Sequence, residues 1–234
     1  MQVAGIDGTK KGWVCVTFDG HTVSGFGVAD IDEALRRLAD ATHIAIDMPI
    51  GFHEAAERGG RQCERLARAR MPGRASSVFS SPCRAALNHS DYRAASAANR
   101  ASCDGGAGLT KQSHAIFPKM REVDAVMAPD LQNRVFEVHP EVSFTELARW
   151  HNTKIHWRKK TEEGQVERTQ LLEAAGLGAG SLLDRCRDFG ARADDVLDAA
   201  VAAWTAHRRR IGLAFCLPVD PPVDARGLRM EMWV

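Results

Sequence analysis

Short apolar runs open the chain and predict the strands of a mixed sheet. Residues 2–6, 13–18 and 21–28 are three such runs, and an Asp-Gly pair between the second and third predicts a hairpin. Residues 30–38 carry apolar side chains at helical spacing, behind an aspartate that can cap a helix. The next apolar run, residues 43–46, predicts a short buried strand. Hairpin-linked strands followed by a helix and another strand indicate a mixed α/β sheet rather than a doubly wound one.

The amino-acid composition changes at about residues 51–133, and this segment predicts a mostly helical insertion. This part is rich in Arg, Ala and Ser, and Gly-Gly, Met-Pro-Gly and Ser-Ser-Pro steps interrupt it. Helices are expected here at residues 60–70, 92–100 and 109–127. We therefore expect one domain, residues 1–234, whose sheet is interrupted between its fourth and fifth strands.

The chain beyond the insertion returns to the sheet and then becomes helical. A fifth strand is expected at residues 134–138. Helices are then expected at residues 143–150, 161–175, 181–189 and 194–207. A last strand at residues 227–234 is expected to close an edge of the sheet.

Charge is distributed unevenly along a chain that is nearly neutral as a whole. The net charge is +1, with 44% apolar and 26% charged residues, which is ordinary for a soluble globular protein. Basic stretches stand out at residues 58–74, 149–160 and 208–210. Such stretches are typical of proteins that bind a phosphate backbone, although each one taken alone is more often a solvated helix face.

Cysteine usage and hydropathy predict a cytoplasmic protein that does not enter a membrane. The six cysteines include no Cys-x-x-Cys pair, so we expect thiols rather than a zinc site. Asp7, Lys10 and Lys11 interrupt any apolar segment of a signal peptide. No apolar run reaches the roughly 20 residues needed to span a bilayer.

Several carboxylates occupy positions at which they could form a metal site. Asp7 ends the first strand, Asp47 ends the fourth, and Glu137 lies inside the fifth. Asp195 and Asp198 are three residues apart and share one face of the last helix. Mg²⁺ and Mn²⁺ prefer carboxylate oxygens, and two such ions about 4 Å apart can bind both the attacking and the leaving oxygen of a phosphodiester.

Each acid also has a structural interpretation, which the sequence leaves open. Asp7 and Asp47 are good turn formers, and Asp195 suits the first turn of a helix. Glu137 could pair with an arginine. Asp198 is harder to explain in this way, because its helix is apolar on most sides and a buried carboxylate needs a partner.

These residues lie within motifs that resemble the family called domain of unknown function 429. The motifs are Gly5-Ile6-Asp7-Gly8, Gly12-Trp13-Val14, Ala45-Ile46-Asp47-Met48-Pro49-Ile50-Gly51, Lys111-Gln112, Arg121-Glu122-Val123-Asp124, Glu137-Val138-His139-Pro140-Glu141-Val142-Ser143-Phe144, Lys160-Thr161 and Asp194-Asp195-Val196-Leu197-Asp198-Ala199. The resemblance implies a ribonuclease-H-like fold with a five-stranded mixed sheet flanked by helices. It also implies a predicted nuclease whose core is similar to that of Holliday-junction resolvases.

The resemblance to resolvases suggests a role for each acid. In those enzymes acids lie on the first strand, on the fourth strand and twice on the last helix. By element order, this assigns metal ligation and catalysis to Asp7, Asp47, Asp195 and Asp198. Glu137 is a fifth catalytic candidate.

Further residues are candidates for contacting the substrate. His139 and Glu141 follow the fifth strand closely enough to reach it, although His139 could instead cap the next helix. Other candidates lie in the insertion and in the basic segments: Lys111, Gln112, Arg121, Lys159, Lys160 and Arg168. The five tryptophans are expected in the core or in an interface, because no run alternating basic and aromatic residues surrounds them.

Taken together, the sequence predicts a Mg²⁺- or Mn²⁺-dependent nuclease, with structured or branched DNA or RNA among its expected substrates. One alternative is a small-molecule phosphotransferase, because Asp7-Gly8-Thr9 is similar to the first phosphate loop of sugar kinases and actin. Against it, the chain lacks a second repeated domain and a Gly-rich adenosine loop. The other alternative is a non-catalytic module of the same fold that binds nucleic acid or protein. The sequence predicts no oligomeric state.

Overall fold

The computed structural model describes residues 1–104 and 107–234, which form two compact units. The first unit contains Met1–Asp47, Asn133–Phe215 and Trp233–Val234, and the second contains Met48–Gln132 and Cys216–Met232. The second unit thus begins close to the expected insertion, and it also takes in a segment near the C-terminus. All six cysteines are described, and none of them is in a disulfide.

A mixed five-stranded sheet forms the centre of the first unit, as predicted. Its strands are β1 (Val3–Gly8), β2 (Trp13–Phe18), β3 (Val23–Val28), β4 (His43–Ile46) and β5 (Val135–Glu137). Their order across the sheet is β3-β2-β1-β4-β5. β1, β2 and β3 are antiparallel neighbours, whereas β4 runs parallel to both β1 and β5.

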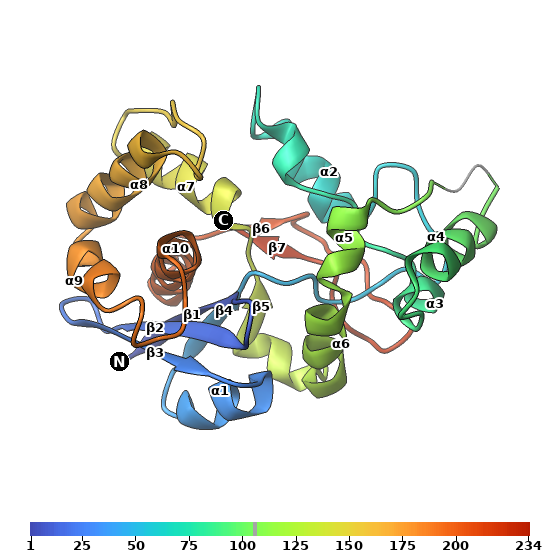
Figure 1. Cartoon of the computed structure of the whole chain (residues 1–234), viewed down its shortest axis with the longest axis horizontal. Helices are drawn as coiled ribbons and strands as arrows, with labels where there is room; N and C mark the ends of the chain where they lie inside the picture. The colour runs from blue at the N-terminus through green and yellow to red at the C-terminus, as the bar shows by residue number, and fades with distance from the viewer. Residues whose placement is uncertain (105–106) are drawn as a thin grey trace. The chain divides into compact units, whose positions relative to one another are not determined.

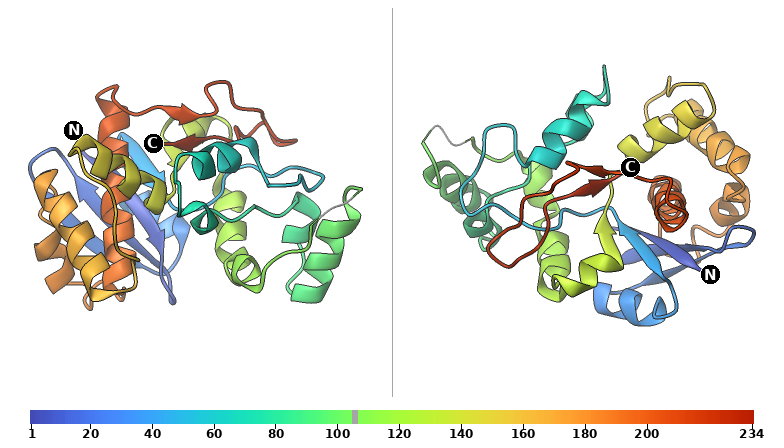
Figure 2. Two further views of the ribbon diagram at one scale, coloured as in Figure 1. Left: turned by 90° about the horizontal axis from the view of Figure 1, so that it is seen from above. Right: turned by 180° about the vertical axis from the view of Figure 1, so that it is seen from behind.

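Helices cover both faces of this sheet (Figures 1 and 2). They are α1 (Ile31–Arg37), α7 (Pro140–Trp150), α8 (Glu162–Ala174), α9 (Ala179–Asp184) and α10 (Ala193–Arg210). α1 covers one face, whereas α10 packs directly on β1, β2 and β4 on the other, with α7, α8 and α9 against it. The main apolar core lies between the sheet and these four helices.

A glycine on β1 lets α10 approach the sheet closely. A Cβ atom added to Gly5 would lie 2.1 Å from the backbone oxygen of Ala199 and 2.2 Å from the backbone nitrogen of Ala203. Both distances are far below van der Waals contact, so no larger residue fits at this position without moving the helix. Small side chains on this part of α10 complete the close packing: Ala199, Ala200, Ala202 and Ala203 are all fully buried.

Element boundaries follow local chemistry, and some of them differ from the sequence predictions. Asp30 caps α1 by accepting a hydrogen bond from the backbone N–H of Glu33 at 2.8 Å. α9 ends at Asp184, five residues before the predicted end. The expected last strand shortens to β7 (Met232–Trp233), which pairs with β6 (Cys216–Leu217), and Trp233 also bridges Val138.

The first segment of the second unit is mostly helical. Its helices are α2 (Gln62–Ala69), α3 (Arg84–Leu87), α4 (Tyr92–Ala101), α5 (Lys111–Ala115) and α6 (Phe117–Val126). The single helix predicted over residues 109–127 is divided in two, because Pro118 begins a new helix and lacks the N–H that would continue the previous one. Within the described ranges, no helix has the length and apolar character needed to cross a membrane.

Buried ion pairs hold the second unit together. The guanidinium of Arg61 donates to Glu64 at 2.8 Å, and both side chains are 2% exposed. Glu64 also accepts from the backbone N–H of Ser81 at 3.1 Å. Arg84 joins Asp124 and Asp224, which tethers the C-terminal segment of this unit to α6. These arginines are engaged within the protein and are not available as a phosphate-binding surface.

Candidate functional site

Strand register brings Asp7 and Asp47 side by side. In the parallel pair β1–β4, Ile6 lies opposite Ile46, and the backbone N–H of Asp47 donates to the carbonyl of Ile6 at 3.0 Å. Side chains alternate between the two faces of a sheet, so Asp7 points to the same face as Gly5, which lies against α10. The same alternation directs Asp47 to that face. The two carboxylates therefore meet beneath α10 at the ends of their strands.

α10 contributes the third carboxylate. Asp198 is 3% exposed and immediately precedes Ala199, the residue whose carbonyl approaches Gly5. Asp7 lies close enough to both Asp47 and Asp198 for their negative charges to raise its pKa. Asp7, Asp47 and Asp198, which we call the aspartate cluster, thus come from three separate elements of the chain.

The positively charged side chain of Lys159 contacts this cluster. The ammonium of Lys159 donates to Oδ2 of Asp198 at 2.7 Å. Burial opposes its charge, but the attraction of Asp198, Asp47 and Asp7 outweighs this effect and raises the pKa of Lys159. The Lys159 side chain is 35% exposed, so it reaches the cluster from the protein surface. Sequence reasoning had assigned this residue to substrate phosphates rather than to the acids.

The aspartate cluster carries more negative charge than Lys159 can balance. Burial raises the pKa of Asp7 well above its ordinary value, and repulsion by Asp47 and Asp198 raises it further. Burial also raises the pKa of Asp47 and that of Asp198 to about 6, against the attraction of Lys159. Asp7 and Asp47 share a side-chain hydrogen bond, which a protonated Asp7 can donate. Additional positive charge would therefore relieve the cluster.

The donor set fits a divalent cation in its chemistry, although the present arrangement is not a formed coordination site. Across residues 1–104 and 107–234, no group of three or more His, Cys, Asp or Glu side chains has a geometry that holds a metal ion. The carboxylates offer only oxygen ligands, which Mg²⁺ and Mn²⁺ prefer. Because the ammonium of Lys159 lies on Asp198, a metal ion that uses Asp198 would have to displace it.

Two of the five predicted catalytic acids lie outside the aspartate cluster. Asp195 accepts a hydrogen bond from the backbone N–H of Arg192 at 3.0 Å and caps α10, so its structural interpretation holds, although its charge still raises the pKa of Asp7. Glu137 lies opposite Ile46 in the β4–β5 register, one residue before the row that contains Asp47. Strand alternation therefore directs Glu137 to the face covered by α1, away from the cluster.

A buried ion pair borders the cluster. Glu141, in the first turn of α7, accepts a hydrogen bond from Arg168 at 2.7 Å, and its charge raises the pKa of Asp47 and Asp198. Arg168 is 1% exposed and also donates to the carbonyl of Gly164 at 3.0 Å. This burial corrects the expectation that Arg168 contacts a phosphate. Arg168 instead neutralises the fourth carboxylate near the cluster.

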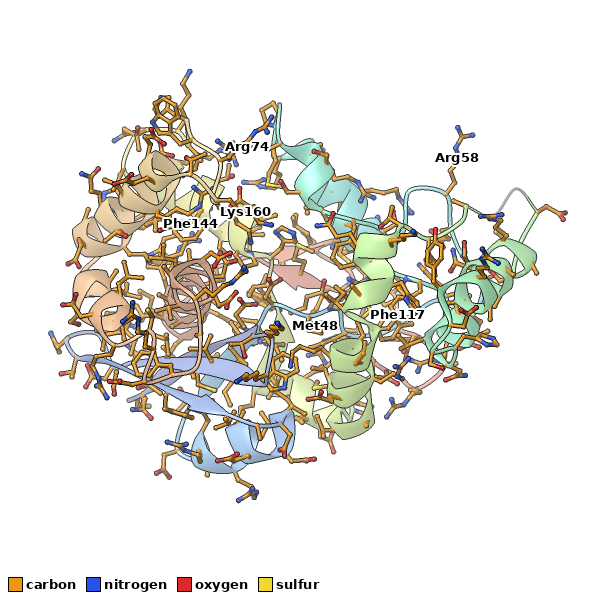
Figure 3. All side chains as sticks on the ribbon, viewed as in Figure 1. Met48, Arg58, Arg74, Phe117, Phe144 and Lys160 are labelled. Atoms are coloured by element: carbon orange, nitrogen blue, oxygen red, sulfur yellow. The ribbon has the colours of Figure 1, made fainter. Side chains whose placement is uncertain are left out.

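The other predicted substrate residues are divided between the two units. His139 is the N-cap residue of α7, and Lys160 is exposed on the loop between α7 and α8 (Figure 3). The second unit holds the rest: Lys111 and Gln112 on α5, and Arg121 on α6. The guanidinium of Arg121 donates to the carbonyl of Leu87 at 2.8 Å, so it supports the fold of its own unit.

Comparison with known proteins gives a family but no activity. A family model described as "Protein of unknown function (DUF429)" matches residues 5–223, which is nearly the whole chain. No curated protein and no solved structure gives a significant match.

Proposed function

We propose that this chain, which belongs to the DUF429 family, is a metal-dependent nuclease that hydrolyses phosphodiester bonds of DNA or RNA. The observation that carries the proposal is the convergence of Asp7, Asp47 and Asp198 from β1, from the end of β4 and from α10. Buried carboxylates that repel one another have no structural use that uncharged side chains would not serve better. They do serve to bind cations.

The fold assigned to the proposal is ribonuclease-H-like. A sheet of three antiparallel, hairpin-linked strands followed by two parallel ones supports this assignment. So does the place of the acids at the ends of the first and fourth strands and on the last long helix. The resemblance to resolvases assigns acids to these same elements, and the β1–β4 register, which places Asp7 beside Asp47, supports the proposal.

Each residue of the site has a role in the proposed mechanism. Asp7, Asp47 and Asp198 would hold Mg²⁺ or Mn²⁺, which would supply charge stabilisation at the phosphate and activation of the attacking water. Asp195 keeps α10 capped, and Arg168 keeps Glu141 neutralised beside the cluster. Lys159 holds the carboxylates together in the absence of metal. Once displaced from Asp198, its ammonium is in place to contact a substrate phosphate.

Nucleic acid is the proposed substrate because the loop that brings Lys159 to the cluster is basic. The loop from residue 151 to residue 161 carries exposed side chains of Lys154, Arg158 and Lys160, in addition to Lys159. It contains no acidic residue. A basic loop of this kind favours binding of a polyanion. The phosphates of that polyanion could approach the carboxylates only if metal ions lay between them.

The experiment that tests the proposal is a cleavage assay with Mn²⁺ and with Mg²⁺. Labelled single-stranded, double-stranded and branched DNA and RNA would be incubated with the wild-type protein, with Asp7→Asn and with the control Asp40→Asn, a change at an exposed aspartate. We expect cleavage by the wild type and the control, and at least a hundredfold loss in Asp7→Asn. Circular dichroism would verify that each variant is folded. Absence of cleavage of every substrate, or equal cleavage by Asp7→Asn, would reject the nuclease.

A further inference from the structure

Two of the five tryptophans lie on the surface of the chain rather than in its core. Trp150 is 55% exposed and Trp157 is 52% exposed, whereas Trp13 and Trp204 are buried. Burying a tryptophan is strongly favourable, so a ring held half in water is informative. Trp157 belongs to the 151–161 loop, which also carries the exposed cations described above. An aromatic side chain and cations therefore occur together on one segment.

Contacts with α8 hold the backbone of Trp157 firmly. Glu167 accepts from the backbone N–H of His156 at 2.8 Å and from that of Trp157 at 3.1 Å. Arg168 donates to the carbonyl of Trp157 at 3.3 Å. At Gly164, an added Cβ would lie 1.9 Å from the carbonyl oxygen of Arg158, so the loop packs directly on the helix. The indole ring is thus presented by a fixed backbone, which lowers the entropic cost of binding to it.

The ring is also close to the aspartate cluster along the chain. Lys159 follows Trp157 by two residues, and its ammonium lies 2.7 Å from Asp198. Two residues of extended chain span at most about 7 Å between Cα atoms. A strand of nucleic acid bound at Trp157 would therefore lie next to Lys159, the residue that contacts the cluster. Arg158 and Lys160 flank Lys159 on either side and are both exposed.

We propose that the 151–161 loop binds unpaired nucleotides, with Trp157 stacking on a base and with Arg158 and Lys160 contacting the adjacent phosphates. Every base offers a flat face to an aromatic ring, but only an unpaired base can leave its own stack to use it. The inference rests on the proposed function and narrows it: the substrate has a single-stranded segment next to the bond that is cut. Duplex without such a segment would be a poor ligand.

Binding in EDTA tests the proposal without cleavage. The full chain would be titrated with fluorescently labelled 12-nucleotide single strands of DNA and RNA and with a 12-base-pair duplex, and anisotropy would be measured. We expect the wild type to bind a single strand at least tenfold more tightly than the duplex. Trp157→Ala should weaken single-strand binding about 5- to 100-fold, the range for loss of one base–aromatic stack. Trp157→Phe should restore most of it.

Trp150→Ala is the matched control, because Trp150 is similarly exposed but is the last residue of α7 and lies outside the 151–161 loop. It should bind within twofold of the wild type. Quenching of tryptophan fluorescence by unlabelled single strand should be large in the wild type and much smaller in Trp157→Phe. The proposal is overturned if Trp157→Ala binds single strands like the wild type, or if duplex binds equally well.

The two proposals fail in different ways. If single strands bind through Trp157 but no substrate is cleaved with Mn²⁺, the nuclease is rejected and the loop remains a nucleotide-binding surface. If cleavage occurs and Trp157→Ala keeps full affinity for single strands, the nuclease stands and the stacking role of Trp157 is rejected.

Discussion

Replacing Asp47 by asparagine should stabilise the protein at neutral pH when no divalent cation is present. The change removes a buried negative charge that repels Asp198, and it preserves the size of the side chain. An asparagine carbonyl can still accept the hydrogen bond that Asp7 donates. Asp47 is the best choice within the cluster, because a change at Asp198 would also leave Lys159 without its partner. Stabilisation by loss of an acid is not the usual result for a buried residue, which makes the test discriminating.

The size of the effect follows from the pKa of Asp47. Burial raises this pKa from 3.8 to about 6, and a difference of this size corresponds to at most about 3 kcal/mol in the free energy of unfolding. The side chain is partly exposed, so water recovers some of that energy. We therefore expect Asp47→Asn to raise the free energy of unfolding by about 1–3 kcal/mol. In a chain of this length, each kcal/mol corresponds to about 2–4 °C in Tm.

The gain should depend on pH in a defined direction. A carboxyl group whose pKa is higher in the folded state than in the unfolded state loses its proton at a higher pH when the protein is folded. The free energy of unfolding of the wild type therefore falls as the pH rises from about 4 to about 6, and it stays lowered above that range. Asp47→Asn has no carboxyl group at this position, so its free energy of unfolding does not fall for this reason. Its advantage should be full at pH 7.5 and small at pH 4.

Thermal and urea unfolding in EDTA at pH 7.5 and at pH 4 measure this difference. Asp40→Asn is the control, because Asp40 is exposed and its replacement should leave Tm within about 1 °C of the wild type at both pH values. The reasoning from the raised pKa of Asp47 is refuted if Asp47→Asn is no more stable than the wild type at pH 7.5. It is also refuted if the advantage is as large at pH 4.

Three further predictions concern the same cluster and the packing that forms it. Adding 10 mM Mn²⁺ should raise the Tm of the wild type by several degrees but leave that of Asp47→Asn nearly unchanged, as differential scanning fluorimetry would measure; equal shifts would contradict the ligand set. Lys159→Met should lower stability in EDTA by about 1–3 kcal/mol, because it leaves Asp198 buried without its cation, whereas Lys160→Met should have no effect in the same urea titration. Gly5→Ala should lower the free energy of unfolding by at least about 3 kcal/mol, because its Cβ would meet the backbone of α10. Normal expression with an unchanged Tm would contradict this prediction and show that the helix can move.

The sequence revealed the sheet and the three acids of the aspartate cluster because all of them depend on local patterns. Alternating apolar runs marked the strands, and an acid directly after such a run marked Asp7 and Asp47 as residues at strand ends. Asp198 was recognised because it interrupts a helix that is apolar on nearly all sides. In each case a polar residue conflicts with its immediate neighbours, and such a conflict can be seen without knowledge of the tertiary structure.

Other features depend on register or on contacts between distant segments, which the sequence does not display. Glu137 was predicted to join the other acids. It pairs with Ile46, one residue before Asp47, and its side chain is therefore directed to the opposite face of the sheet. Lys159 approaches Asp198 from a loop that is 39 residues away in sequence. The pairing of Arg168 with Glu141 spans 27 residues and could be recognised only once α7 and α8 were placed side by side.

The packing of α10 on the sheet explains why the three carboxylates are held close together. Gly5 brings the helix onto the sheet at Ala199, and this contact places the preceding residue, Asp198, over the ends of β1 and β4. A larger residue at position 5 would push the helix away and relieve the repulsion among the carboxylates. It would also remove the apolar contacts of the helix with the sheet. Folding and the assembly of the aspartate cluster are therefore one event, so every variant that alters this contact should change both the stability of the first unit and the geometry of the cluster.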